Sequence, residues 1–279
     1  MRLLKTSRLS IDSVAWTVSI ALACGVLIAM PAALAAAKSD MTQRPECLLR
    51  NKLEAVSIKR VTDGDTVVLS DERRVRLIGI NTLELNEKNA SDRAWAKEAS
   101  ASLEAFVSGG SIQIVPGIET HDRHGRLLAH LLRSDGVNAS HQLVSQGLAI
   151  AIAVGKNTRC AIELQTLEQS ARETESGLWR NPGAWRVTKD RLTGRERGFR
   201  IVHSRVIRSD HHGKRRTLLL ENGLLVKVGR HWPVKNRSQQ KMLDSIVGKK
   251  IRVKGWLGVH AGKSVITLDH PGNILVFEH

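Results

Sequence analysis

Short runs of apolar and β-branched residues, broken by polar turns, most constrain how this chain can fold. Three such runs lie between Glu54 and Ile80, separated by Asp63-Gly64 and Asp71-Glu72. This pattern predicts three strands joined by tight turns. The predicted strands are Ala55–Arg60, Thr66–Ser70 and Arg73–Ile80.

A helix is expected next, because apolar residues recur at helical spacing from Trp95 to Val107. Ser91 or Asp92 is expected to cap its start, and Gly109-Gly110 to end it. The remaining expected elements are strands at Ser111–Val115 and Leu127–Leu132 and helices at Asn138–Gly147 and Arg159–Ser176. Five strands with three helices at the side predict a mainly β, α+β domain built on a small OB-type barrel.

The C-terminal part repeats this order of elements after a stretch that is typical of a linker. Residues 181–197 carry Pro182, two glycines and many charges without periodicity. Five further strands are predicted at Phe199–Ile207, Thr217–Glu221, Leu224–Val228, Lys250–Trp256 and Val265–Leu268. A helix-like stretch at Ser238–Val247 falls between the third and the fourth of them. This order predicts a second, smaller OB-like β-barrel.

The N-terminus is typical of a secretory signal peptide. Three basic residues precede an apolar run from Val14 to Met30, and small residues follow. We therefore expect a signal peptide at residues 1–35, an N-terminal segment at 36–53, the first domain at 54–180, the linker at 181–197 and a basic domain at 198–279. Export would place the protein in the periplasm or outside the cell. The alternative is an inner-membrane anchor through residues 14–36, since a span needs about 20 residues.

Export would also change the expected state of the cysteines. Cys24 would leave with the signal peptide, so Cys47 and Cys160 would remain as an even pair. In an oxidising compartment such a pair favours an intramolecular disulfide. The alternative is two free buried thiols.

The positive charge of the chain is concentrated in its C-terminal part. The whole chain carries a net charge of +16. Residues 198–279 contain sixteen Lys and Arg against five Asp and Glu, a net charge of +11. Such an excess favours a polyanionic partner, either nucleic acid or an acidic membrane surface, although a basic face can also be merely solvated. Seven of the eleven histidines lie in the same part, but their spacing fits no metal-ligand pattern.

The residues best suited to chemistry lie in three short motifs. The motifs are Thr62-Asp63-Gly64-Asp65-Thr66, Val75-Arg76-Leu77-Ile78-Gly79-Ile80-Asn81-Thr82-Leu83-Glu84 and His121-Asp122-Arg123-His124-Gly125-Arg126. Carboxylates beside a tight turn supply hard oxygen ligands suited to Ca²⁺. A strand arginine can hold a phosphate through two hydrogen bonds, and Glu84, just past a strand end, is placed like a general base for water.

In this order and spacing the motifs resemble the staphylococcal nuclease family, whose members are also called thermonucleases. The resemblance covers about Glu54 to Trp179. It includes Val144-Ser145-Gln146-Gly147-Leu148-Ala149 and the closing Gly177-Leu178-Trp179. It implies endonucleolytic hydrolysis of DNA and RNA with calcium as cofactor and with little sequence preference.

The resemblance also implies a set of metal ligands. Asp65 would ligate calcium through its carboxylate, Thr82 through its backbone carbonyl, and Asp63 would support the site as a nearby carboxylate. Asn81 stands at a ligand position where the family usually has a second carboxylate. An amide oxygen can still coordinate, but ligand charge helps to set calcium affinity, so a weaker calcium site is expected.

The catalytic roles implied by the resemblance fall on three residues. Glu84 would activate or orient water, and Arg76 and Arg126 would bind the phosphate and stabilise the five-coordinate transition state. The family usually has proline at the position of Leu83, so the loop that presents Glu84 is expected to be less rigid here.

The aromatic content departs from the family as well. The chain has no tyrosine, whereas the family uses tyrosines around its nucleotide pocket, where this chain offers His124, Ala153 and Gly155. Stacking on nucleobases must therefore be weaker here or be supplied by other side chains.

The tryptophans are the candidates for such stacking. Core positions are expected for Trp95 and Trp179. Trp232 and Trp256, in the basic C-terminal segment, could stack bases as OB-type barrels do. A core position is favoured for Trp256, while both roles stay open for Trp232.

Two further functions compete with a working nuclease. A domain of the same fold could bind nucleic acid without turnover, with Asn81 and the missing tyrosines as marks of lost catalysis. Alternatively, an envelope protein could use the basic barrel to bind anionic lipid or polymer. Retention of Glu84, Arg76 and Arg126 favours the nuclease.

Overall fold

The computed structural model describes residues 45–48, 52–87, 89–181, 187–188, 191–212, 215–229, 232 and 237–277. The expected signal peptide at residues 1–35 and the alternative anchor at 14–36 lie outside these residues, as do parts of the linker. Within the described part of the chain, no helix is both long and apolar enough to cross a membrane.

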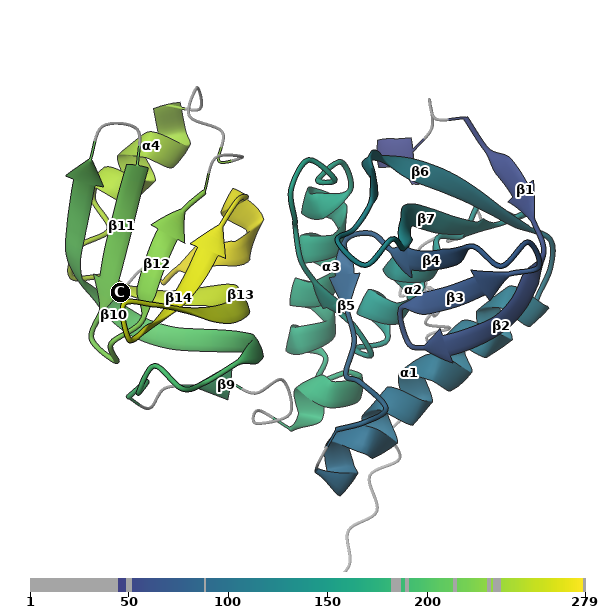
Figure 1. Cartoon of the computed structure of the whole chain (residues 1–279), viewed down its shortest axis with the longest axis horizontal. Coiled ribbons are helices and arrows are strands. Elements are labelled where there is room, and N and C mark those ends of the chain that lie inside the picture. The colour runs from purple at the N-terminus through teal and green to yellow at the C-terminus, as the bar shows by residue number, and fades with distance from the viewer. Residues whose placement is uncertain are drawn as a thin grey trace, which may run out of the picture. The chain divides into compact units, whose positions relative to one another are not determined.

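Six strands form the first sheet, in the order β1-β6-β7-β4-β3-β2. They are β1 (Glu54–Val56), β2 (Ile58–Asp63), β3 (Thr66–Leu69), β4 (Arg74–Leu77), β6 (Ile112–His121) and β7 (Leu127–Arg133). Strands β2, β3 and β4 form an antiparallel meander, and β7 pairs parallel with β4. Figure 1 shows these strands curling together. Without β1, this connectivity is that of a five-stranded OB-type barrel, as predicted.

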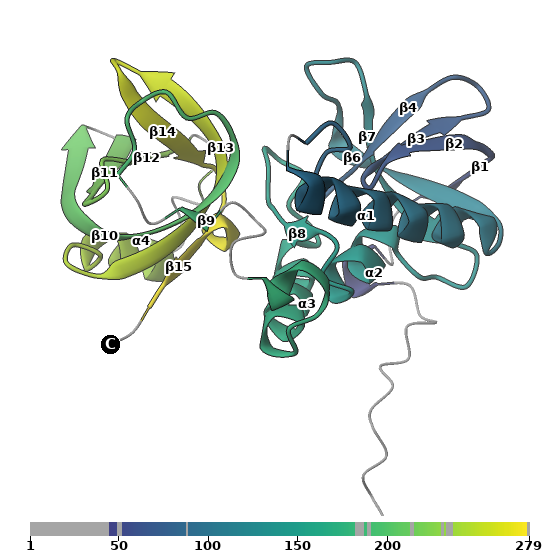
Figure 2. The same ribbon diagram turned by 90° about the horizontal axis from the view of Figure 1, so that it is seen from below.

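Helix α1 (Ala90–Ser108) lies between β4 and β6 in the chain and packs beside β2 (Figure 2). Its buried face presents Ala96, Ala99, Leu103 and Phe106, at the spacing expected for one helix face. The predicted cap was wrong: Asn89 caps the helix, because its side chain accepts a hydrogen bond from the Ser91 amide at 2.8 Å.

Two shorter helices follow the sheet. Helix α2 (Ala139–Ser145) is capped by Asn138, and α3 (Ala161–Glu173) begins directly after Cys160. Cys160 is joined to Cys47 by a disulfide across 113 residues. This bond ties the short 3₁₀ turn Glu46–Leu48 to the start of α3. A small separate ladder pairs β5 (Ile80–Asn81) with β8 (Ile150–Ala151).

The second sheet closes on itself into a five-stranded barrel. Its main strands are β10 (Gly198–His212), β11 (Arg215–Leu220), β12 (Leu225–Val228), β13 (Lys250–His260) and β14 (Lys263–Leu268). Strand β13 pairs with both β14 and β10, which completes the ring (Figure 2). Helix α4 (Arg237–Asp244) lies between β12 and β13 in the chain, so the order of elements is that of an OB barrel.

Two short strands of this sheet were not expected from the sequence. Strand β9 (Val187–Thr188) lies within the predicted linker and pairs parallel with β10. Strand β15 (Ile274–Val276) follows a 3₁₀ turn at Pro271–Asn273 and pairs with β13. Both are too short to leave a period-2 pattern that could be recognised.

The tryptophans of the second barrel differ from expectation. Trp232 is buried in the core, with 3% of its surface exposed, whereas Trp256, predicted as core, is 47% exposed. The strand alternation explains the second result. Ile251, Val253 and Leu257 of β13 are buried, so Trp256 falls on the opposite face of the strand. Trp95 and Trp179 are partly buried, and both pack against core clusters.

Candidate active site

The turn between β2 and β3 brings two carboxylates together. The Asp65 amide donates a hydrogen bond to Asp63 Oδ1 at 3.1 Å, which closes the turn around Gly64. A Cβ atom at Gly64 would lie 2.6 Å from the Cβ of Ala99 and 3.0 Å from Cγ2 of Thr82. Glycine is therefore needed there because the turn packs directly against α1 and against the loop that contains Thr82.

The Asp65 carboxylate is buried, and each of its oxygens has a partner. Oδ1 accepts a hydrogen bond from the Thr66 hydroxyl at 3.1 Å, and Oδ2 accepts one from the Thr82 amide at 3.1 Å. Oδ2 also lies 2.8 Å from Nη2 of Arg76. A buried carboxylate needs such partners, because burying an unpaired one would lower the free energy of unfolding by roughly several kcal/mol through lost hydration. Asp65 thus fixes Arg76 and Thr82 relative to the turn.

Arg76 extends this cluster along the next loop. Its guanidinium donates to the backbone oxygens of Leu77 and Ile80, both at 3.0 Å, and to Oδ1 of Asn81 at 3.2 Å. Nδ2 of Asn81 in turn donates to the Thr82 carbonyl at 3.3 Å. The predicted ligand positions 65, 81 and 82 are therefore linked to Arg76 in one hydrogen-bonded cluster.

The loop that carries these groups is held from beneath by packing. Asn81 pairs with Ile150 in the β5–β8 ladder. Ile150 belongs to a small buried cluster that also contains Leu83 and Ala96. The apolar Leu83 side chain thus anchors the loop through burial, at the position where the family resemblance would place a proline.

Glu84 follows this loop and is exposed to solvent. With Asn81 and Thr82 it lines a cavity of about 160 Å³. Burial, the neighbouring Asp65 and the charge of Glu84 raise the pKa of Asp63 to about 7. The carboxylates of this region therefore repel one another, and a bound cation would relieve that repulsion.

Arg126 lies at the start of β7, after a turn in which Gly125 has a φ of +73°. Its Nε donates to Asp122 Oδ2 at 2.7 Å, and its amide donates to Asp122 Oδ1 at 3.0 Å. Burial would raise the pKa of Asp122, but these bonds and one from the His124 amide lower it. Strand β7 pairs with β4 so that Leu128 lies opposite Arg76, and Arg126 is two residues before Leu128. The two arginines thus lie on neighbouring strands, but the guanidinium of Arg126 is bound to Asp122.

The donors around Asp65 fit a hard cation in kind. A carboxylate, an amide oxygen and a backbone carbonyl are ligands that Ca²⁺ accepts. Among the described residues, the one group of three or more His, Cys, Asp and Glu residues with ligand atoms within 4.8 Å of one another is Cys47, His141 and Glu163. Cys47 is bonded to Cys160, which removes it as a thiolate ligand. Asp63, Asp65 and Glu84 do not form such a group, so amide and carbonyl oxygens would have to complete a metal site around Asp65.

Two aromatic residues of the second barrel line the same cavity as Glu84. They are Phe199 and Trp256, and sequence reasoning assigned neither to the site. The exposure of Trp256 could have been predicted from the sequence. Side chains alternate between the two faces of a strand, and Trp256 falls on the same face as Lys250 and Arg252, opposite the buried Ile251 and Val253.

Comparisons with known proteins show what most of the first barrel is similar to. Residues 74–181 match the family described as Staphylococcal nuclease homologue. A thermonuclease of Staphylococcus intermedius is 28% identical over 129 residues, which are 45% of this chain and 76% of that protein. An uncharacterized endonuclease of Escherichia coli O157:H7 is 28% identical over 137 residues, 47% of this chain and 84% of that protein. A thermonuclease of Staphylococcus hyicus is 25% identical over 132 residues, covering 46% and 77%. From β4 onward, the first barrel of this chain is therefore similar to the staphylococcal nuclease homologue family and to bacterial thermonucleases and endonucleases.

Proposed function

We propose that this chain hydrolyses phosphodiester bonds of DNA and RNA with calcium as its cofactor. The observation that carries the proposal is the arrangement around the 160 Å³ cavity, where Glu84 stands beside Asn81 and Thr82. Both of these residues are linked to the buried Asp65–Arg76 pair. The nuclease names of the relatives, at 25–28% identity, support the same reaction class.

In this proposal Asp65, Asn81 and the Thr82 carbonyl hold the calcium ion, and Asp63 adds negative charge from the adjacent turn. A bound calcium ion would polarise the phosphate and screen the charge that develops as the phosphorus–oxygen bond breaks. Burial is the largest cause of the raised pKa of Asp63, and repulsion by Asp65 and Glu84 adds to it; the repulsive part supports a cation at this place.

The remaining roles fall on Glu84 and the two arginines. Glu84 takes up or orients the proton of the attacking water, since it is exposed and lines the cavity. Arg76 and Arg126 bind the phosphate and stabilise its transition state. Each guanidinium is ion-paired in the structure, Arg76 with Asp65 and Arg126 with Asp122, so substrate phosphate competes with a carboxylate for each.

Export to the periplasm or the medium is part of the proposal. It rests on the signal-like N-terminus and is supported by the Cys47–Cys160 bond, since disulfides persist in oxidising compartments. The retained alternative is an inner-membrane protein held through residues 14–36.

A binding protein without turnover is the second candidate, and one observation favours it. The oxygens of Asp65 and Asn81 both already accept hydrogen bonds or ion pairs from Arg76. Asn81 also carries no charge of its own to attract a cation.

A digestion assay with chelation separates the two functions. Purified protein is incubated with single- and double-stranded DNA and with RNA, in calcium and then in excess chelator. We expect cleavage in calcium that stops when the metal is removed. Salt-sensitive binding without cleavage would establish the binding protein instead.

Asn81→Asp is expected to tighten calcium binding. A second carboxylate adds a unit charge near the ion, and such a charge at 4 Å is worth about 1 kcal/mol even in bulk water. We therefore expect calorimetry to show an affinity at least about fivefold higher. Asn86→Asp, an exposed change in the same loop, serves as control for added charge. Equal affinity of the Asn81→Asp variant and the parent would remove position 81 from the ligand set.

A further inference from the structure

Trp256 is the one exposed aromatic side chain among the large apolar residues that the structure describes. Its contact with Phe199 is T-shaped, with ring centroids 5.3 Å apart and planes at 77°. An edge-to-face contact orients the indole but can cover at most one of its faces. The ring is therefore held in place and still offers surface to a ligand.

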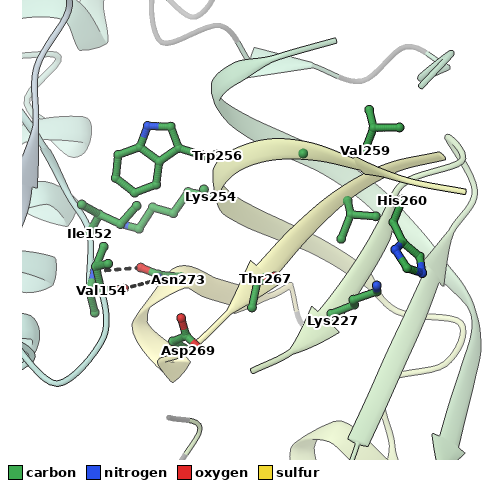
Figure 3. Close-up of a pocket in the computed structure, with 14 residues that line it drawn as sticks. Ile152, Val154, Lys227, Lys254, Trp256, Val259, His260, Thr267, Asp269 and Asn273 are labelled. Atoms are coloured by element: carbon green, nitrogen blue, oxygen red, sulfur yellow. Dashed lines mark hydrogen bonds between the residues drawn. The ribbon is translucent and has the colours of Figure 1, made fainter. Parts of the chain in front are cut away.

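The same indole borders two cavities. One is the 160 Å³ cavity lined by Asn81, Thr82 and Glu84. The other has a volume of about 430 Å³, and Figure 3 shows Trp256 at its rim, beside Lys254 and Ile152. Trp256 thus stands between the candidate active site and a second cavity.

The second cavity combines apolar surface with positive charge. Val154 and Val259 are exposed at its wall, and Lys227 and His260 line it together with the acidic Asp269 (Figure 3). Apart from Ile152, Ala153 and Val154, its lining residues come from residues 198–279, which carry a net charge of +11. Aromatic surface within a basic groove is the combination by which proteins hold single-stranded nucleic acid, through base stacking and phosphate contacts.

We propose that Trp256 stacks on a nucleobase of a strand bound at the candidate active site, and that Lys227 and His260 meet the phosphate beyond that base. This inference rests on the proposed function, because the ligand is its substrate. It gives the second barrel a role in binding: it supplies the aromatic platform in a chain that has no tyrosine.

Binding of a labelled single-stranded DNA octamer to the full chain tests the inference, measured by fluorescence anisotropy in chelator so that no cleavage occurs. Base–aromatic stacking is worth about 1–3 kcal/mol, so Trp256→Ala is expected to weaken binding about 5- to 150-fold. Trp256→Phe is expected to retain most of the affinity. Ile207→Ala, which removes an apolar side chain that is 49% exposed, is expected to bind within about twofold of the parent.

An abasic octamer with the same phosphates separates stacking from charge. Trp256→Ala is expected to leave its binding unchanged. Equal losses for the normal and the abasic octamer, or no loss for either, would overturn the stacking role. The binding assay requires no turnover, so the two proposals can fail separately. If Trp256→Ala weakens binding but the protein does not cleave nucleic acid, the nuclease proposal alone is wrong. If the protein cleaves but Trp256→Ala binds like the parent, the stacking proposal alone is wrong.

Discussion

Glu84→Gln is expected to lower phosphodiester cleavage by about 10²–10⁴-fold, the range that a general base contributes. The amide keeps the size of the side chain but cannot accept the proton of the attacking water. Glu84 is exposed at the cavity that Asn81 and Thr82 also line, and the amide retains a hydrogen-bonding side chain of the same shape there. Binding of single-stranded DNA in chelator should therefore stay within a few fold of the parent, as should the melting temperature. Initial rates in saturating calcium measure the effect.

The matched control is Glu98→Gln, which makes the same chemical change at an exposed position of α1. It is expected to cleave at the parental rate. A Glu84→Gln variant that retains full activity would remove Glu84 from the chemistry, even if calcium dependence persisted. Loss of DNA binding in parallel with loss of cleavage would instead assign Glu84 to substrate or metal binding.

The first barrel was predictable because its signals are local. Its strands follow from β-branched runs and turns, and the buried face of α1 follows from the spacing of Ala96, Ala99 and Leu103. The order of strands around one helix then leaves few arrangements besides an OB-type barrel. The cap of α1 was misplaced because Asn89, Ser91 and Asp92 are all good capping residues, and only the hydrogen bond from the Ser91 amide distinguishes them.

The sequence motifs name the residues of the candidate site, but they do not indicate how those residues contact one another. The motifs name Asp65, Arg76 and Asn81, yet nothing in their spacing indicates that Arg76 bridges the other two. The place of Trp256 depends on contact between residues far apart in the chain, since Glu84 and Trp256 line one cavity. No local pattern encodes such a pairing, although the alternation along β13, which the expectation of a core Trp256 overlooked, places the indole on the face away from its own core.

Another contact between residues distant in sequence joins α3 to β13. Substitutions that break this contact are expected to lower the stability of the protein strongly. Glu168 Oε2 lies 2.9 Å from Lys254 Nζ and accepts the Ala151 amide at 2.7 Å, while Arg172 binds Oε1 at 2.9 Å. Glu168 and Lys254 are 2% and 5% exposed. Burial would raise the pKa of Glu168, but Lys254 and Arg172 lower it, so the carboxylate is charged near neutral pH.

Glu168→Leu is expected to lower the free energy of unfolding by about 3–5 kcal/mol, because it leaves the buried Lys254 ammonium without its partner. Removing both charges in Glu168→Leu/Lys254→Met should recover a large part of that loss, since apolar pairs of similar volume often replace buried ion pairs without cost. Urea unfolding followed by circular dichroism measures both variants. The exposed pair Lys59–Glu72, with side chains 51% and 68% exposed, supplies the control, and Glu72→Leu should cost less than about 1 kcal/mol.

The same carboxylate also supports the candidate active site, which makes the variants informative about function. Ala151, whose amide it accepts, pairs with Ile80 next to Asn81. Glu168→Leu should therefore weaken calcium binding as well as stability, whereas Lys254→Met, which leaves Arg172 and the Ala151 amide on the carboxylate, should weaken calcium binding less. If both single variants lose calcium affinity equally, the contact of Lys254 in β13 with Glu168 is itself needed to position the loop that contains Asn81 and Thr82. If neither does, the β5–β8 ladder is held by its own packing, and Glu168 serves stability alone.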